Sequence, residues 1–332
     1  MRAAAIAHSY LDQRIIEPFA DARVNLSRGN TLEPCALPDV ALVFGGDGAV
    51  HRQLSALANA SVPTLVVPAG SANDFARCLG IGSRADALRA WRNFLNRGDN
   101  VRAVDLGAVR PVALQEPSES PPPDSSTFAQ ADGRIAPPSQ PLGPAIMRQQ
   151  LHHARQSSES QRVIYFSGIA GIGLDAETNR VAARMPGWLR RTAGYPLAAL
   201  AALARYRAIP VRIQSFDRYG RETVLDEPVL FASVGNAPEY GSGIRMLPQA
   251  LLDDGELDLC VVAAMPLLRV LRHFYRVYAG THLQMPEVRY LRTRQLFIES
   301  ADPSPIYADG EYLCQTPAEI SVSPRALRVI VP

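Results

Sequence analysis

The stretch that decides the fold runs from residue 40 to residue 82 and reads VALVFGGDGAVHRQLSALANASVPTLVVPAGSANDFARCLGIG. It contains the order strand, glycine turn and helix twice. Val40–Phe44 and Thr64–Val67 are continuous apolar runs, which are typical of strands buried on both faces of a parallel sheet. Each run ends in a glycine turn that is followed by a helical pattern. The pattern therefore predicts two parallel strands that end at the same edge of a sheet.

These two turns have the chemistry of a phosphate site. Glycine turns at the carboxyl ends of adjacent parallel strands form the crevice in which such sheets bind ligands. Glycines let backbone N–H groups approach an anion, and helix N-termini favour negative charge. The candidate nucleotide-binding residues are Gly45, Gly46, Asp47, Gly48, Gly70, Ser71, Asn73 and Asp74. Asp47 and Asp74 also fit a purely structural role as turn or helix caps.

The two turns also carry a resemblance. GGDG followed after about twenty residues by PxG(S/T)xNDFAR resembles the diacylglycerol kinase catalytic-domain family, the bacterial lipid kinases and their sphingosine and ceramide kinase relatives. NAD kinases share the GGDG turn but lack PxGxxNDFAR. The resemblance implies a doubly wound, NAD-kinase-like α/β N-terminal domain and a mainly β C-terminal domain built as a two-layer sandwich. ATP would lie in the cleft between them, where Asp47 would act through Mg²⁺ or an ordered water.

The composition narrows the functional classes to which the protein could belong. The 332 residues suffice for two domains, and 47% hydrophobic with 20% charged residues is typical of a globular protein with a sizeable core. A formal net charge of +2 and the lack of basic-aromatic clusters give no indication of nucleic acid binding. No apolar run is long enough for a transmembrane segment. We expect a cytoplasmic protein with a lipid substrate at the membrane surface. Peripheral attachment to the inner membrane face and homodimer formation stay open.

Three regions follow from composition and pattern. Residues 1–109 are expected to form the nucleotide-binding domain. Residues 110–161 contain PSESPPPDSS and APPSQPLGP, which cannot bury enough apolar surface to fold, so we expect a disordered insertion. Residues 162–332 are expected to form the lipid-substrate domain, whose last strands could return to the first domain. Its predicted strands are Val163–Ile169, Val211–Phe216, Glu227–Gly235, Leu257–Ala263, Val288–Tyr290, Leu296–Glu299, Ile306–Ala308, Ile320–Val322 and Leu327–Val331, with helices at Trp188–Arg207 and Leu267–Tyr278.

An acidic turn in the C-terminal domain, LLDDGELDL at 251–259, resembles the family's structural Mg²⁺ site. The resemblance implies ligation by the Asp254 carboxylate and by the carbonyls of Leu251 and Glu256. Oxygen ligands suit a hard cation. A plain β-turn is the rival interpretation, because Asp-Asp-Gly is common turn chemistry. Asp105, in the strand pattern at 101–109, is either structural or a supporting residue beside the cleft.

A second acidic turn, Asp309–Glu311, matches the family's late Asp-Gly-Glu motif. The resemblance implies that Glu311 is the general base for the lipid hydroxyl and that Asp309 lies on the metal or beside it. A primary hydroxyl barely ionises at neutral pH, so a carboxylate would mainly orient it and take the proton late. The predicted function is therefore ATP-dependent phosphorylation of a lipid hydroxyl, in a diacylglycerol-, phosphatidylglycerol- or sphingoid-like acceptor.

Several positions depart from the family pattern. Relatives read GGDGTxNEV where this chain has GGDGAVHRQ, so Ala49 lacks a hydroxyl and Arg52 replaces an acid. Ser167 stands where asparagine is usual, and the family's Asn-Pro-x-(Ser/Ala)-Gly turn is not found in residues 1–39. These departures keep two alternatives open: a catalytically weak member that binds nucleotide or lipid, and, less favoured, an NAD-kinase-like enzyme.

Overall fold

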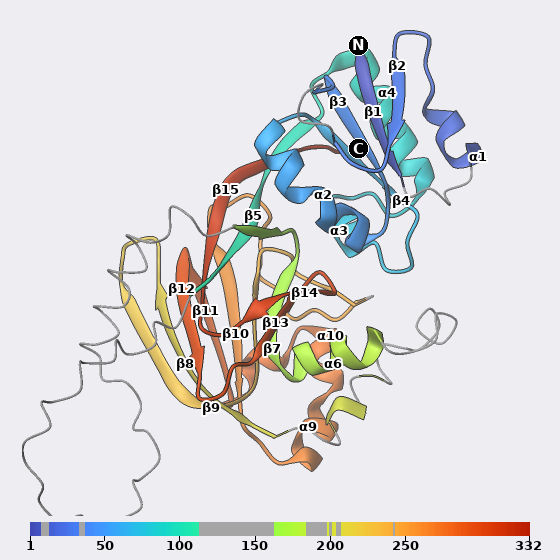
Figure 1. The fold of residues 1–332 in the computed structure, drawn as a ribbon. Coiled ribbons are helices and arrows are strands. Elements are labelled where there is room, and N and C mark those ends of the chain that lie inside the picture. Colours follow the sequence, from blue (N-terminus) through green and yellow to red (C-terminus); the bar gives the residue numbers. More distant parts are fainter. Residues whose placement is uncertain are drawn as a thin grey trace, which may run out of the picture.

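The protein has two lobes, which are drawn at the top and bottom of Figure 1. The computed structural model describes residues 1–7, 13–32, 37–112, 163–183, 198, 201–203, 207–241 and 243–332. The predicted insertion at 110–161 and the predicted helix at 188–207 lie almost entirely outside these residues.

The N-terminal lobe is built on a parallel sheet with the strand order β2-β1-β3-β4. Every residue of Val40–Phe44 in β3 and of Thr64–Pro68 in β4 is buried, which confirms the prediction of strands covered on both faces. The elements are β1 (Arg2–Ala7), α1 (Gln13–Ile16), η1 (Glu17–Phe19), β2 (Asn25–Gly29), β3 (Val40–Gly45), α2 (Asp47–Ala60), β4 (Thr64–Pro68), α3 (Asp74–Cys78) and α4 (Arg84–Arg97).

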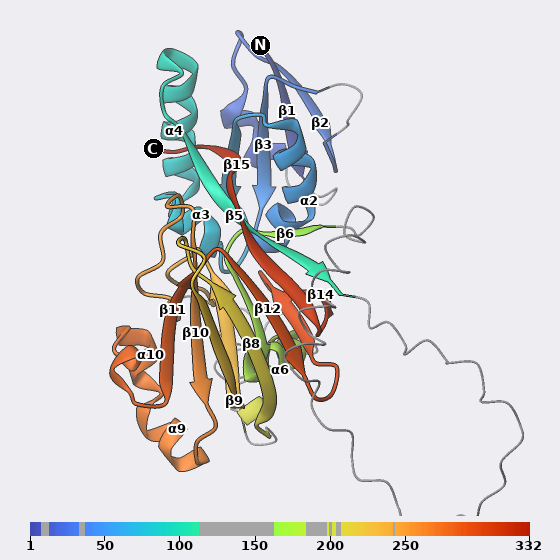
Figure 2. The same cartoon turned by 90° about the vertical axis from the view of Figure 1, so that its left-hand side faces the viewer.

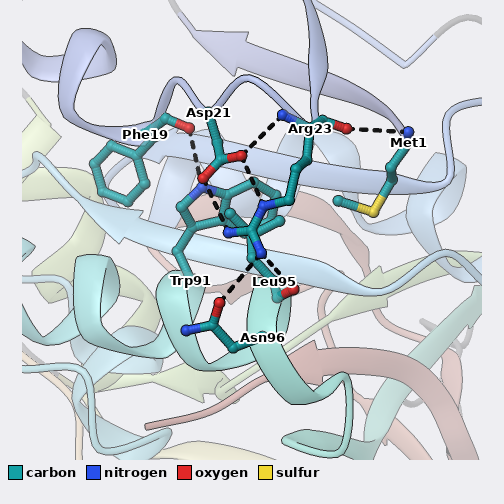
Figure 3. A network of polar contacts seen from close by, with 7 residues as sticks. All are labelled: Met1, Phe19, Asp21, Arg23, Trp91, Leu95 and Asn96. Atoms are coloured by element: carbon teal, nitrogen blue, oxygen red, sulfur yellow. Dashed lines mark hydrogen bonds and ion pairs between the residues drawn. The ribbon is translucent and has the colours of Figure 1, made fainter.

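The stretch from Phe19 to Arg23, just before β2, is attached to α4. Trp91 of α4 is fully buried, and its indole N–H donates to the carbonyl of Phe19 at 2.9 Å. Figure 3 shows the Arg23 guanidinium donating to the Leu95 carbonyl at 3.3 Å and to the Asn96 side chain at 3.2 Å. These contacts hold the segment before β2 against the last turns of α4.

Two long antiparallel strands join the lobes. β5 (Val101–Pro111) pairs with β15 (Ala318–Ile330) along nearly its whole length, and Figure 2 shows both strands running from one lobe into the other. The first half of β15 also pairs with β12 in the lower lobe, while Val329 pairs with Thr64 of β4 in the upper one. Two separate strands were predicted here. Instead one strand continues through an irregularity at 323–327, where Arg325 has φ +53°.

The C-terminal lobe is a mainly antiparallel β structure. β9 organises it by pairing with β8, β7 and β10. The predicted strand at 163–169 is two strands separated at Ser167–Gly168, and β14 was not predicted at all. The elements are β6 (Ile164–Phe166), β7 (Ile169–Gly173), α6 (Leu174–Ala183), β8 (Ile209–Phe216), β9 (Glu222–Gly235), β10 (Leu257–Ala263), α9 (Leu267–His273), α10 (Tyr275–Ala279), η3 (His282–Gln284), β11 (Val288–Thr293), β12 (Gln295–Ser300), β13 (Pro305–Ala308) and β14 (Glu311–Gln315).

Hydrophobic residues fill both faces of the central strands in this lobe. Side chains such as Phe166, Ile213 and Leu296 form the core of the sandwich. The other face of β9 and β10, which includes Phe231 and Val262, packs against a second cluster that takes in residues of α9 and α10. Among the described residues, no helix has the length and apolarity that crossing a membrane requires.

Candidate active site

The two glycine turns lie against each other at the carboxyl edge of β3 and β4. A Cβ atom on Gly70 would lie 2.5 Å from the Cα of Gly46, and one on Gly46 would lie 3.0 Å from the Cα of Gly70. The two backbones are thus close enough that a side chain at Gly70 would collide with the facing turn. Asn73 fixes the second turn, because its side chain accepts from the Gly70 N–H and donates to the Gly70 carbonyl, both at 2.9 Å.

The first turn leads into α2 without a side-chain cap. The N-cap residue is Gly46, so the first N–H groups of the helix have no side-chain acceptor at this position. The N-terminus of a helix with free N–H groups favours an anion. A Cβ on Gly48, in the first turn of α2, would lie 2.9 Å from Oε1 of Glu311. The predicted phosphate turn and the predicted base therefore adjoin. The predicted Ser71 is exposed on the second turn.

The N-terminus of α3, unlike that of α2, has a side-chain acceptor, which is the carboxylate of Asp47. This carboxylate accepts from the N–H groups of Asp74 at 3.1 Å and Phe75 at 3.0 Å, which begin α3. Burial raises the pKa of Asp47 above its usual value, and the negative charge of Asp309 adds to this. The anion at this helix end is thus the protein's own carboxylate. These contacts are those of a cap; contact with Mg²⁺ or an ordered water remains a prediction for Asp47.

Asp74 connects the lobes. Its Oδ2 accepts from the N–H of Gly241, in the C-terminal lobe, at 2.7 Å, and its Oδ1 pairs with Arg77. Arg77 also lies 3.9 Å from the carboxylate of Glu239. Residues 239–241 are therefore held against the second glycine turn, a contact that the sequence did not indicate.

The carboxylate of Asp309 is buried among hydrogen-bond donors that come from both lobes. It accepts from the Ser167 N–H at 2.8 Å, the Ser167 hydroxyl at 3.1 Å and the Gly168 N–H at 2.9 Å. Nδ1 of His51, on α2, lies 3.3 Å from Oδ2 of Asp309. The Asp309 side chain is 4% exposed. Asp309 thus ties the break between β6 and β7 to α2, and its predicted contact with a metal remains untested.

Glu311 is the accessible acid of the same turn. Its side chain is 47% exposed, and its Oε1 lies 3.8 Å from Nη1 of Arg52. Arg52 is one of the positions at which the chain departs from the family pattern. Its guanidinium lies within reach of Gly48, so the carboxylate and the guanidinium both border the first turn of α2. A carboxylate in this place can accept a proton from a hydroxyl that approaches the phosphate turn.

A cleft of about 150 Å³ lies between the lobes beside these groups, and its lining reaches Gly310 but does not include Glu311. Asp47 and Asp74 line it from the N-terminal lobe, and Gly168, Tyr240 and Asp309 line it from the C-terminal lobe. A second cavity, of about 130 Å³, lies within the C-terminal lobe, where nearly all of its walls are apolar. Tyr240 lines both spaces. The sequence did not single out Tyr240, which belongs to no motif, or His51, which stands at the asparagine position of the GGDGTxNEV pattern.

The predicted structural Mg²⁺ site has a different arrangement. The carboxylate of Asp254 pairs with Arg292, and Glu256 lies 3.0 Å from Arg292 and 2.7 Å from Arg218. The Leu251 side chain is exposed on the same turn. Among the described residues, no group of three or more His, Cys, Asp and Glu side chains could hold a metal ion. Arginines already neutralise both carboxylates, so a divalent ion would have to displace Arg292. This arrangement does not fit the metal.

Asp105 of β5 is buried next to this acidic turn. Its carboxylate accepts from the N–H groups of Gly255 and Arg325, both at 2.7 Å, and its own N–H donates to the Leu252 carbonyl at 2.7 Å. The strand β5, the acidic turn and the irregularity in β15 therefore meet at one carboxylate. These contacts are structural, which agrees with one of the two roles considered from the sequence.

Comparison with known proteins places this architecture in a family. Residues 28–109 match the model of the diacylglycerol kinase catalytic domain, and residues 168–331 match that of the YegS C-terminal NAD kinase beta sandwich-like domain. A crystal structure of a diacylglycerol kinase from Bacillus anthracis superposes with a TM-score of 0.62 at 16% identity, over 100% of this chain and 97% of that one. The predicted fold class is confirmed.

Relatives with similar sequences agree. A diacylglycerol kinase of Mycobacterium tuberculosis is 29% identical over 294 residues, which is 89% of this chain and 77% of that protein. A diacylglycerol kinase of Bacillus subtilis is 25% identical over 297 residues, which is 89% of this chain and 78% of the relative. Both alignments span the two lobes. The chain therefore belongs to the diacylglycerol kinase catalytic-domain family of lipid kinases, which are phosphotransferases that act on hydroxyl groups.

Proposed function

We propose that the protein transfers the γ-phosphate of ATP to the hydroxyl of a lipid. The observation that carries this proposal is the position of Glu311, an accessible carboxylate beside the uncapped, glycine-rich start of α2. Phosphoryl transfer needs held phosphates and a group that orients the attacking hydroxyl. These two requirements are met by residues that are 263 positions apart in the sequence, counted from Gly48 to Glu311.

In this proposal, MgATP is a substrate whose phosphates lie on the turn from Gly45 to Gly48. The N–H groups at the start of α2 would hold the phosphate oxygens. Glu311 would accept a hydrogen bond from the lipid hydroxyl and orient its oxygen toward the γ-phosphorus. As the new oxygen–phosphorus bond forms and the bond to ADP breaks, the hydroxyl proton passes to Glu311. Asp309 would keep this turn in place through its contacts with Ser167, Gly168 and His51.

The apolar cavity supports a lipid as the acceptor. Its lining includes Leu230, Val262, Met265 and Phe274, which offer no charge to a ligand. A hydrocarbon chain placed there would leave water for an apolar surface, which is favourable. Because Tyr240 borders both the cavity and the cleft, a chain in the cavity would place its polar end near the reacting groups. Diacylglycerol, phosphatidylglycerol and sphingoid bases all have this form.

A weaker alternative rests on Arg52. The ion pair between Arg52 and Glu311 could hold the predicted base away from a hydroxyl, which would leave a protein that binds nucleotide and lipid with little turnover. Both side chains are about half exposed, however, and such pairs are weak. An approaching hydroxyl can therefore compete for Glu311. An NAD-kinase-like activity gains no support, since the family is that of lipid kinases.

Incubation with radiolabelled ATP, Mg²⁺ and a total lipid extract tests the proposal and identifies the acceptor. A labelled lipid product is the expected result. ATP binding without any labelled lipid would favour the alternative of a binding protein. In a parallel incubation with NAD in place of the lipid extract, transfer of label to NAD would contradict the proposal.

A substitution tests the nucleotide site directly. Gly46→Val should abolish ATP binding, because Gly46 already lies against Gly70 and a branched side chain would cover the backbone of the turn. The measurement is calorimetric titration with MgATP. Gly82→Val is a control for the loss of a glycine, because Gly82 is exposed, has no positive φ, and a Cβ there would approach only Oδ2 of Asp86 at 3.6 Å. An unchanged affinity in folded Gly46→Val would contradict the assignment.

A further inference from the structure

A cluster of large apolar side chains is exposed on the two short helices α9 and α10. Leu268 is 78% exposed and Tyr275 is 61% exposed, and Leu267, Leu271 and Tyr278 are also exposed. Five of the eleven exposed large hydrophobic side chains of the described residues thus lie within twelve consecutive positions. Scattered apolar side chains are ordinary on a protein surface, whereas a contiguous group marks an interaction site.

The same segment is basic and has no acidic residue. From Ala264 to Pro286 the chain contains Arg269, Arg272 and Arg276 and neither aspartate nor glutamate. Arg269 pairs with Glu287 at 2.6 Å. Arg272 is exposed, and no residue that the structure describes forms an ion pair with it. The apolar side chains are therefore interleaved with positive charge, a combination typical of helices that lie on anionic membranes.

The inner side of this segment forms a wall of the apolar cavity. Val270, Leu271, Phe274 and Val277 all line that cavity. Leu271 does so while also being exposed, so only a thin layer of side chains separates the cavity from the outer surface. Neither α9 nor α10 contains a fully buried residue. In Figures 1 and 2, α9 lies at the end of the C-terminal lobe that is remote from the N-terminal lobe, and α10 lies next to it on the side toward the N-terminal lobe.

We propose that the segment Leu267–Ala279, the docking surface, binds the face of an anionic phospholipid bilayer and admits the lipid to the cavity behind it. This inference rests on the proposed function, since a lipid kinase must take its acceptor from a membrane. The exposed leucines and tyrosines insert among the lipid chains and headgroups, and the arginines contact the anionic headgroups. The lipid would enter beside Leu271, which is exposed and also lines the cavity.

Vesicle binding tests this surface without reference to catalysis. The full chain is sedimented with vesicles of phosphatidylcholine alone and of phosphatidylcholine mixed with phosphatidylglycerol, in the absence of ATP. We expect the protein to bind the mixed vesicles and the affinity to fall as salt is raised. Each arginine–headgroup contact that is lost should lower the affinity about five-fold. The double variant Leu268→Asp, Tyr275→Asp should reduce the vesicle affinity at least about ten-fold, because two apolar side chains that insert into the bilayer are replaced by charged ones. Neither residue lines the cavity.

Matched variants control for the chemistry of each change. Leu37→Asp with Tyr219→Asp places the same two charges at an exposed leucine and an exposed tyrosine outside the docking surface, and should bind vesicles like the wild type. Arg272→Glu should weaken binding to anionic vesicles, whereas Arg97→Glu, on the exposed end of α4, should not. Equal binding by the Leu268/Tyr275 double variant and the wild type, or no wild-type binding at all, would overturn the inference.

Two further readouts separate the remaining outcomes. Activity toward lipid in vesicles should fall in the double variant, while activity toward the same lipid dispersed in detergent stays at the wild-type level. A change of molecular mass from dimer to monomer with unaltered vesicle binding would instead identify the surface as a contact between two copies and overturn the membrane assignment. Vesicle binding by a wild type that phosphorylates no lipid would refute the proposed function while leaving the docking surface supported.

Discussion

Two turns in the C-terminal lobe have the same sequence, Asp-Gly-Glu, at 254–256 and 309–311. In both, the glycine has a positive φ, +76° at Gly255 and +84° at Gly310. Their carboxylates have opposite environments. In the first turn Glu256 is 3% exposed and Asp254 is 18% exposed, whereas in the second Asp309 is 4% exposed and Glu311 is 47% exposed. The tripeptide places a left-handed glycine in both turns, but the backbones differ, since Asp309 has φ +53° and Asp254 has no positive φ, and the tripeptide does not determine which acid is buried.

The partners explain this difference. Glu256 directly precedes the buried strand β10 and pairs with Arg218 and Arg292, so its charge is neutralised where it lies. Asp309 is instead held by backbone N–H groups and a hydroxyl, which leaves Glu311 at the rim of the cleft. A carboxylate saturated by arginines is unsuited to accept a proton from a substrate. The comparison therefore supports the proposed chemistry at the second turn and favours a structural role for the first.

The largest effect should come from removing the basic charge at the second turn. Glu311→Gln keeps the shape of the side chain and should reduce turnover by about a hundred- to ten-thousand-fold, the usual cost of losing a general base. ATP affinity and melting temperature should stay near wild type, because the phosphate turn lies in the other lobe. The matched change Glu256→Gln should lower stability and leave turnover in place. Equal turnover of wild type and Glu311→Gln would make Asp309 the next candidate base.

A buried acid next to the first turn gives a smaller effect that depends on pH. Asp258 is fully buried in β10, and this burial raises its pKa to about 6. A raised pKa means that its contribution to stability is present below the unfolded value near pH 4 and is lost as pH rises through about 6.

Asp258→Asn removes that dependence. It should be more stable than the wild type at about pH 8, by at most about 3 kcal/mol for a shift of about two units, with the difference vanishing toward about pH 4. Urea unfolding at both pH values measures this. An advantage of the same size at both values would show that the Asp258 charge is not its cause.

The smallest effect concerns the arginine of the first turn. Arg292→Met leaves the buried Glu256 with Arg218 alone and should cost about 1 to 2 kcal/mol, since Arg292 itself is partly exposed. Arg102→Met is the matched control, because it removes an exposed pair with Asp253 in the same turn and should cost less than about 1 kcal/mol.

Mg²⁺ sharpens this test of the first turn. It should shift the melting temperature of the wild type no more than NaCl of the same ionic strength does. A specific stabilisation by Mg²⁺ that Asp254→Ala abolishes would restore the metal site implied by the sequence.

Strands and turns were predicted most accurately where the pattern that indicates them lies within a few consecutive residues. β3, β4 and their turns follow from apolar runs interrupted by glycine, so their positions were correct within a residue or two. β14 was missed because EYLCQ is short and mixes exposed with buried positions. β15 was predicted as two strands because SPRA at 323–326 contains a proline, and the structure continues the strand through an irregularity anchored by Asp105.

Contacts between distant residues were beyond this kind of prediction. His51 meets Asp309 across 258 positions, and Asp47 caps α3 across 27. Neither partner carries a local signal for the other. The motifs named acids that the structure places near one another, and the hydrogen bonds of Asp47 and Asp309 show which of these carboxylates already have partners within the protein.

The pairing of β15 has a consequence for synthesis on the ribosome. Residues 327–330 lie between β4 and β5 in the N-terminal sheet, although they are translated more than 200 residues after both. Until then, one edge of β4 and one edge of β5 in the nascent N-terminal lobe are unpaired. An unpaired strand edge can pair with other chains. Only when β15 emerges does the sheet close, so both lobes reach the native state in the same late event.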